Sequence, residues 1–269
     1  MTFWKVVLSY DGTSFHGWQV QPGRPTVQGT LSAALEKITG ERVLPQGSGR
    51  TDAGVHALGQ VASFALEAVI PAANLSRALN HALPQSIRIL HAEEVPQEFH
   101  ARHSAVRKSY EYRIFERRVD ALDQGWTCPP FVAPYVWDCR WTVEMGPMEK
   151  AAAMLRGTHD FTSFQASDPD AAQREFGAVG PNPVKTLFES VVVREEGLLR
   201  YRVTGSGFLH HMVRNIVGTL VEVGRGSVQA EEMARILAAK DRTAAGPTAP
   251  AQGLFLVEVS YDRGKAVEV

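Results

Sequence analysis

The chain opens with hydrophobic and polar positions that alternate with a period of two, which predicts a β-strand ending at the turn signal Asp11-Gly12. Hydrophobic positions with a helical period follow; they begin after Thr26, a good N-cap residue, and stop at Gly40. Two strands, a helix opened by a proline and one more strand complete the order β-α-β-β-α-β. The predicted elements are strands over 3–10, 42–46, 58–66 and 87–95, and helices between Thr26 and Gly40 and between Pro71 and Pro84.

The second half of the chain repeats this order of elements with longer connections, although no residue-by-residue repeat is visible. Glu196-Gly197 predicts the turn of a hairpin, and a helix with a broad hydrophobic stripe follows it. The stretches 116–147 and 165–183 contain several prolines and no clear period, so we expect long loops there. The predicted elements are strands over 106–115, 184–194, 198–204 and 254–261, and helices over 148–156, over 209–223 and around Met233, Ile236 and Leu237.

Each half therefore has the element order of a ferredoxin-like unit, in which two helices cover one face of an antiparallel sheet. We predict an α+β fold of two ferredoxin-like subdomains, 1–103 and 104–269, which form a continuous, mainly antiparallel sheet with a central active-site cleft. RNA-binding proteins often use open sheet faces of this kind, but the fold alone does not fix the function.

The composition is that of a globular protein with a real core, because 44% of the 269 residues are hydrophobic and 21% are charged. The net charge is −1, so a polyanion would have to be held by local basic patches. The N-terminal residues lack the hydrophobic core of a secretion signal, and Cys128 and Cys139 form no C-x-x-C motif. A reduced, cytoplasmic setting without a membrane partner is therefore expected.

The richest candidate site lies between two predicted strands, in the segment GSGRTDAGVHA that contains Arg50, Asp52 and His56. Its glycines allow positive φ angles and a close approach to a ligand, and the guanidinium and the carboxylate are near enough in sequence to share a pocket. The spacing matches neither the dinucleotide-binding fingerprint nor a phosphate-binding P-loop. Composition alone leaves two alternatives open, a reactive loop or a hairpin loop with a solvated ion pair. We expect His56 to stabilise the loop rather than to act in catalysis.

Seven motifs follow one another along the chain: YDGTSFHGWQ (10–19), GRTDAGVHA (49–57), FHAR (99–102), KSYEYRI (108–114), DFTSF (160–164), HHMVRNIVG (210–218) and AKDR (239–242). Together they resemble the tRNA pseudouridine synthase A family. The resemblance implies isomerisation of uridine to pseudouridine at positions 38–40, in the anticodon stem-loop of tRNA. It also implies a homodimer that uses no cofactor and no metal.

The resemblance assigns roles to four residues. Asp52 falls on the Asp of the family's R-T-D motif, the catalytic carboxylate, and Arg50 lies beside it. Tyr110 falls on the first Tyr of the K-x-Y-x-Y segment, which contacts the substrate. Arg214 falls on the Arg of the H-H-M-V-R-N helix.

Two features depart from the family's pattern. Ser48 stands where the family more often has a small apolar residue, and this difference should have little effect on the reaction. The 165–183 loop is longer than usual, which leaves substrate contacts in that loop open.

The chemistry suits these residue types. Conversion of uridine to pseudouridine breaks the C1′–N1 bond, rotates the uracil and joins C1′ to C5, with no redox change and no group lost. A carboxylate can attack the sugar carbon or add to the uracil ring, and the sequence leaves both routes open. A nearby guanidinium, for which Arg214 is the first candidate, would lower the pKa of Asp52 and keep it ionised.

The target uridine is stacked in the RNA and has to be extracted from it. Arg50 could then occupy the vacated place. A tyrosine ring can stack on the uracil, and its hydroxyl can reach the C5 proton that leaves after rebonding. Tyr110 and Tyr112 share a strand face, so we expect one to stack and the other to pack, with Tyr112 as the core residue.

Phosphate binding is expected from local charge. Residues 102–118 carry a net charge of +4, and we predict that Arg102, Arg107 and Lys108 bind RNA. A solvated strand face is the alternative for each single arginine. A second strip carries +3 and consists of Arg200, Arg202, Arg214 and Arg225 with Glu222.

No metal site is predicted. His100 with His103, and His210 with His211, have ligand-like spacing, but neither pair is part of an established metal-binding motif. Two other functions stay open at this point: a non-catalytic RNA-binding module on the same fold, and a carboxylate-dependent glycosidase or nucleosidase.

Overall fold

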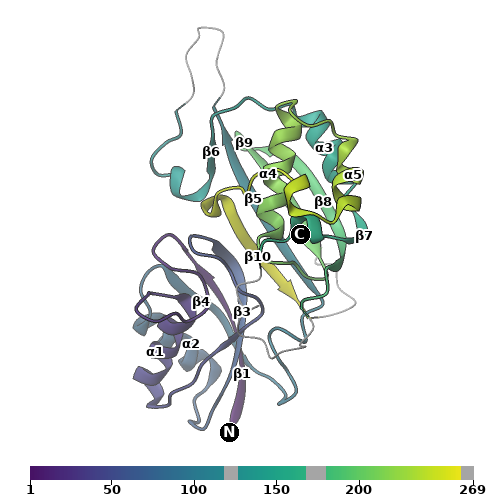
Figure 1. Cartoon of the computed structure of the whole chain (residues 1–269). Coiled ribbons are helices and arrows are strands. Elements are labelled where there is room, and N and C mark those ends of the chain that lie inside the picture. Colours follow the sequence, from purple (N-terminus) through teal and green to yellow (C-terminus); the bar gives the residue numbers. More distant parts are fainter. Residues whose placement is uncertain (118–126, 168–179, 262–269) are drawn as a thin grey trace. The chain divides into compact units, whose positions relative to one another are not determined.

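The computed structural model describes residues 1–117, 127–167 and 180–261 of the chain. It is a mixed α/β fold with a mainly antiparallel sheet and few helices, in agreement with the predicted α+β class (Figure 1). The chain divides into two compact units: residues 1–108 with the segment from Phe255 onward, and residues 109–254. No helix within the described ranges is long and apolar enough to cross a membrane.

The first unit is built around the strand that opens the sequence. Its elements are β1 (Thr2–Tyr10), α1 (Val27–Thr39), β2 (Gln46–Gly47), β3 (His56–Leu66), α2 (Ala72–Ala82) and β4 (Ile87–Glu94). β1 pairs antiparallel with β3 on one side and with β4 on the other. Alternate side chains from Trp4 to Tyr10 are buried, which confirms the predicted period of two. α2 packs against both α1 and β4 (Figure 1).

Both ends of α1 follow the predicted signals. The Thr26 hydroxyl accepts a hydrogen bond from the backbone N–H of Gly29 at 3.3 Å, so Thr26 is the N-cap. Gly40 takes a left-handed φ of 78°, and its N–H donates to the carbonyl oxygen of Glu36 at 2.8 Å. α2 likewise begins directly after Pro71.

The predicted strand over 42–46 is wrong for most of its length, because β2 begins only at Gln46. The hydroxyl of Ser32, on α1, donates a hydrogen bond to the carbonyl oxygen of Val43. Pro45 has no N–H to offer to a strand partner. The segment therefore satisfies its backbone against α1 instead of in a sheet.

The last strand of the chain, β10 (Leu254–Ser260), pairs in parallel with β3, with Phe255 opposite His56. β2 pairs farther along the same strand, with Gln46 opposite Ser63. The pairing of β10 with β3 accounts for the assignment of this C-terminal segment to the first unit. The predicted domains, 1–103 and 104–269, group β10 with the second half of the chain, and that division stays a prediction.

The second unit carries the other α-helices. Its elements are β5 (Arg107–Glu116), β6 (Trp137–Cys139), α3 (Met145–Ala153), β7 (Gly157–Asp160), β8 (Val184–Glu195), β9 (Leu198–Gly205), α4 (Met212–Gly224) and α5 (Glu232–Ala239). The first two residues of β5, Arg107 and Lys108, belong to the first unit. β5, β9, β8 and β7 are neighbours in this order, and β6 pairs in parallel with β5. α3 packs on β8 and on α4 (Figure 1). Short 3₁₀ helices cover Ala133–Tyr135, Thr162–Phe164, Arg242–Ala244 and Ala251–Gly253.

The hairpin of the second unit confirms the sequence prediction, and three other features correct it. β8 and β9 are joined by Glu196-Gly197, both with positive φ, as a two-residue hairpin turn requires. α3 begins three residues earlier than predicted, because a proline is tolerated in the first turn. α4 begins only at Met212, because His211 has a left-handed φ of 59° that a right-handed helix excludes. β6 lies in the stretch 116–147, which was predicted to be a loop.

We expect Gly218→Ala to destabilise the protein, although alanine is the better helix former. An added Cβ at Gly218, within α4, would lie 1.6 Å from the carbonyl oxygen of Pro247. The backbone clash should lower the free energy of unfolding, measured by chemical denaturation, by about 1–3 kcal/mol or more. Gly146→Ala is the matched control, because no atom lies within 4 Å of its added Cβ in α3. Equal stability of the two variants would contradict the tight packing of α4.

Candidate active site

Asp52 lies in a tight turn on the loop between β2 and β3. The backbone N–H of Val55 donates to the carbonyl oxygen of Asp52 at 3.1 Å, which closes the turn. Gly54, the third residue of this turn, has a φ of 78°, a value that favours glycine. The side chain of Asp52 is partly exposed, whereas Thr51 beside it is buried. The turn therefore presents the carboxylate while its neighbours anchor the loop.

The segment that follows β1 packs directly on this turn. The N–H of Trp18 donates to the carbonyl of Thr51 at 3.0 Å, and the N–H of Gly54 donates to the carbonyl of Phe15 at 3.3 Å. Gly17, with a φ of 83°, approaches so closely that an added Cβ would lie 2.5 Å from the carbonyl oxygen of Thr51. The motifs YDGTSFHGWQ and GRTDAGVHA are therefore two parts of one folded structure.

Buried polar side chains support the loop from below. The Ser48 hydroxyl donates to Gln60 Oε1 at 2.6 Å, and Gln60 Nε2 donates to the carbonyl of Gly49 at 3.0 Å. The hydroxyls of Tyr10 and Thr51 share a hydrogen bond of 2.8 Å. Burial raises the pKa of Tyr10 to about 12, against the smaller opposing effect of its hydrogen bonds. Tyr10 is therefore a neutral part of the scaffold.

His56 stabilises the loop, as predicted from the sequence. It is buried, its ring stacks on Phe255 at 4.7 Å between centroids, and its Nδ1 accepts a hydrogen bond from the N–H of Gly12 at 3.1 Å. The Asp11 carboxylate lies 3.3 Å from the same nitrogen. His56 thus ties the end of β1 to the end of the loop that carries Asp52.

Arg50 is exposed on the same loop, and its Nε donates to Gln19 Oε1 at 3.2 Å. Its guanidinium is therefore accessible to a ligand approaching the loop. The predicted partnership of Asp52 with Arg214 joins residues of different units and stays a prediction. In the second unit, the Nε of Arg214 donates to the carbonyl of Ala249 at 2.8 Å, which fixes the side chain at the start of α4.

The two tyrosines of the KSYEYRI motif have different surroundings. Tyr112 is fully buried, and its hydroxyl donates to the carbonyl of Pro250 at 2.7 Å. Burial raises the pKa of Tyr112 well above its usual range, although the charge of Arg214 opposes this. Tyr110 is only partly buried and meets the ring of Phe208 edge-on, 4.9 Å between centroids. As predicted, Tyr112 is the core residue, and Tyr110 is the one left with an accessible surface.

The first predicted basic strip has varied surroundings. Arg102 is exposed on a loop that His100 stabilises, since His100 Nδ1 accepts from the N–H of Arg102 at 3.0 Å. Arg107 is partly buried at the start of β5. Lys108 donates from Nζ to the carbonyl oxygen of Ser48 at 2.6 Å, a contact that the sequence analysis missed. Arg118, the last residue of this strip, and most of the 165–183 loop lie outside the described residues.

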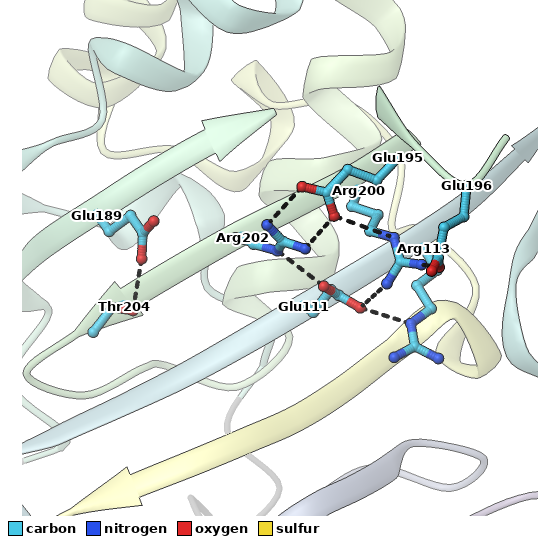
Figure 2. Close-up of polar contacts among 8 residues, drawn as sticks. All are labelled: Glu111, Arg113, Glu189, Glu195, Glu196, Arg200, Arg202 and Thr204. Carbon is cyan, nitrogen blue, oxygen red and sulfur yellow. Dashed lines mark hydrogen bonds and ion pairs between the residues drawn. The ribbon is translucent and has the colours of Figure 1, made fainter. Parts of the chain in front are cut away.

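Two arginines of the second strip belong to a network of ion pairs around Glu111. Figure 2 shows the Glu111 carboxylate facing three guanidinium groups across β5 and β9. They are Arg113 at 2.7 Å, Arg200 at 3.0 Å and Arg202 at 3.0 Å. Glu111 itself is buried, so these partners replace the water that its charge would otherwise require.

Two arginines of the second strip, Arg200 and Arg202, therefore have their charge partnered within the chain. Arg202 also pairs with Glu195 at 2.5 Å, and Arg200 pairs with Glu196 (Figure 2). These carboxylates come from the end of β8 and from the hairpin turn. The hairpin register places Val193 opposite Arg200 and Val191 opposite Arg202, so cross-strand pairing alone does not identify Glu195 and Glu196 as their partners. Arg225 likewise pairs with Glu222 at 3.1 Å.

Comparisons with known proteins identify the family of this chain. The model of a protein family described as tRNA pseudouridine synthase matches residues 6–104 and 151–262. Asp52 and Arg214 lie in the matched segments, and Tyr110 lies outside them. The tRNA pseudouridine synthase A of Solibacter usitatus (strain Ellin6076) is 49% identical, over 96% of this chain and 98% of its own. The protein of the same name from Moorella thermoacetica is 44% identical over 96% and 98% of the two chains. That from Thermoanaerobacter sp. (strain X514) is 42% identical over 95% and 98%.

We expect Glu111→Gln to lower the free energy of unfolding at pH 7 by about 1–3 kcal/mol, because the three guanidinium groups lose a charged acceptor. Burial raises the pKa of Glu111, but the hydrogen bonds and charges of the arginines outweigh it and hold this pKa below the ordinary 4.5. The carboxylate therefore stabilises the fold above its unfolded-state pKa, and this stabilisation is lost as the pH falls through the folded-state pKa.

Chemical denaturation at pH 7 and in steps down to about pH 3 checks this prediction. The variant should have a flatter pH dependence than the parent protein in the acid range. Glu36→Gln, on the exposed face of α1, is the control and should leave both the midpoint and its pH dependence unchanged. A Glu111→Gln protein as stable as the parent at pH 7 would show that the network contributes nothing.

Proposed function

This chain belongs to the tRNA pseudouridine synthase family and isomerises uridine in tRNA to pseudouridine, and we propose that Asp52 is the nucleophile of the reaction. The observation that carries this proposal is the construction of the loop. Its backbone is clamped by the segment 12–18 and by buried polar groups, while Asp52 is partly exposed. A carboxylate held in this way is in place before the substrate binds, which lowers the entropic cost of the attack.

The isomerisation needs only one nucleophile and a proton acceptor. The bond between C1′ and N1 breaks, the uracil turns, and C1′ bonds to C5, after which the C5 proton leaves and N1 ends as an N–H. The carboxylate of Asp52 either attacks C1′ or adds to the uracil ring, and it is released again when the new bond has formed. Both routes require the ionised carboxylate, and we propose that Arg214 is the guanidinium that favours this form.

We propose that Tyr110 contacts the uracil. Its partly exposed ring can stack on the base, and the edge-on contact with Phe208 fixes the ring's orientation. Its hydroxyl is our candidate for the group that accepts the C5 proton. Tyr112 is unsuited to either role because it is buried and donates to Pro250.

We also propose the finer features that the resemblance implies. Arg102 and Arg107 contact phosphates, and Arg50 takes the place of the extracted uridine in the RNA. The substrate positions are 38–40 of the anticodon stem-loop, the active species is a homodimer in the cytoplasm, and each unit is a ferredoxin-like subdomain. In support of an extracted base, the exposed Arg50 lies two residues from Asp52 on one rigid loop.

Asp52→Asn should abolish turnover, because the amide is not a nucleophile and cannot form the ester or adduct that either route requires. Tritium release from tRNA transcripts labelled at C5 of uridine measures turnover directly. Thermal unfolding and tRNA affinity should stay close to those of the parent protein, because the amide has the same shape and the loop is held by backbone contacts. Tritium release at an undiminished rate would exclude Asp52 as the nucleophile.

Tyr110→Phe should keep tRNA affinity and lower the single-turnover rate by about 100–10,000-fold, since the ring stays and the proton acceptor is lost. Tyr112→Phe is the matched control. It removes a buried hydrogen bond to a carbonyl and should cost stability, about 1 kcal/mol, with little change in rate. A Tyr110→Phe enzyme as fast as the parent would limit Tyr110 to stacking.

A further inference from the structure

Lys108 makes a contact that its predicted role in RNA binding does not explain. Its Nζ donates to the backbone carbonyl oxygen of Ser48 at 2.6 Å, and both residues belong to the first unit. Ser48 is buried and opens the loop that carries Asp52 four residues later. A lysine that binds phosphate as a surface charge has no need of a partly buried position against the backbone of its own chain.

The loop is shaped to receive the ammonium group. Gly49 lies directly beside it, and an added Cβ at this position would be 3.1 Å from Lys108 Nζ. Such a separation is tighter than an ordinary van der Waals contact, so even a methyl group would press on the lysine. The glycine of this motif therefore permits the approach of Lys108 to the backbone.

Two elements hold the same short stretch of loop. Gln60, on β3, accepts from the Ser48 hydroxyl at 2.6 Å and donates to the carbonyl of Gly49 at 3.0 Å. Lys108, on β5, takes the carbonyl of Ser48. The two carbonyl groups that precede Arg50 thus have donors from different strands, one of them charged. A charge-assisted hydrogen bond is the stronger kind, so losing it should loosen this end of the loop.

We propose that Lys108 is a positioning residue for Asp52, which acts through the Ser48 carbonyl, and that it is not a phosphate contact. This inference rests on the proposed catalytic role of Asp52. Lys108 fixes where the loop leaves β2, and the clamped turn then fixes the carboxylate relative to the substrate. A small displacement of a reacting group is costly in rate even when binding is unaffected.

The test separates rate from affinity. Lys108→Met removes the charge and the donor, and Lys108→Gln removes the charge but keeps a donor. Lys37→Met, on the exposed surface of α1, is the matched control. Each purified full-length protein is assayed for its single-turnover rate at saturating tRNA, for its tRNA affinity at several salt concentrations and for its thermal stability.

We expect Lys108→Met to lower the single-turnover rate by about 10–100-fold, in the range of a small misplacement of a reacting group. Its tRNA affinity and the salt dependence of that affinity should match those of Lys37→Met. Lys108→Gln should recover part of the lost rate, because its amide can still donate to the carbonyl. Gly49→Ala, which crowds the ammonium, should lower the rate in the parent and have little further effect in Lys108→Met.

The proposal would be overturned, and Lys108 identified as a phosphate contact, if Lys108→Met bound tRNA more weakly but kept its rate at saturation. The slope of log affinity against log salt concentration would then be reduced by about one. An unchanged rate with unchanged binding would overturn it too. If Lys108→Met does not fold, the rates of Lys108→Gln and Gly49→Ala decide in the same way. Failure of the catalytic role of Asp52 is distinguishable, because Asp52→Asn would then keep its turnover whatever the lysine variants do.

Discussion

The candidate site depends on one close contact between two stretches of backbone. At Gly12 an added Cβ would lie 2.1 Å from the carbonyl oxygen of Val55, and at Gly17 it would lie 2.5 Å from that of Thr51. Nothing larger than a hydrogen atom fits at either position. The turn that carries Asp52 is therefore held from both ends by a segment far away in the sequence. Catalytic groups gain most from such rigidity, because no reorganisation is needed when the reaction begins.

Many charged side chains of this protein form ion pairs with one another. The chain has almost no net charge, and the structure uses many of its arginines as internal partners of carboxylates. Glu111 holds three of them, and the buried Glu116 pairs with Arg194 at 2.9 Å. Counting charges along a strand therefore overstates what RNA can use, because a paired guanidinium has already found its anion. Arg50 and Arg102 are exposed, whereas the guanidinium groups of Arg200 and Arg202 are held by carboxylates.

Local signals in the sequence predicted local structure well. The alternation in β1, the cap at Thr26, the stop at Gly40 and the turn at Glu196-Gly197 all depend on residues within a few positions of one another. The strand period also placed Tyr110 and Tyr112 on one face, although the resemblance was needed to expect that Tyr112 is the one that packs. These features need no knowledge of the rest of the chain.

The features that sequence reasoning missed are contacts over long distances. β10 pairs in parallel with β3 through two residues, a pairing that no local pattern announces. The stretch 42–46 has strand-like residues, but a hydroxyl on α1 takes one of its carbonyls. The contact of Lys108 with Ser48 joins residues 60 positions apart. In each case a backbone group forms its hydrogen bond with a partner that is distant in the sequence and comes close only in the folded chain.

The phenols of this chain illustrate how burial selects chemistry. Tyr10, Tyr112 and Tyr201 are all buried, and burial is the main cause that raises their pKa values. A buried phenol with a raised pKa stays neutral at ordinary pH, so it can donate to a carbonyl or share a hydrogen bond within the core. Tyr110 differs from these three because it is only partly buried. It lies on the same strand face as Tyr112, but in the first part of β5, where the side chains are partly exposed. The motif K-x-Y-x-Y thus places one tyrosine in the core and leaves the other partly exposed, two residues apart on the same strand face.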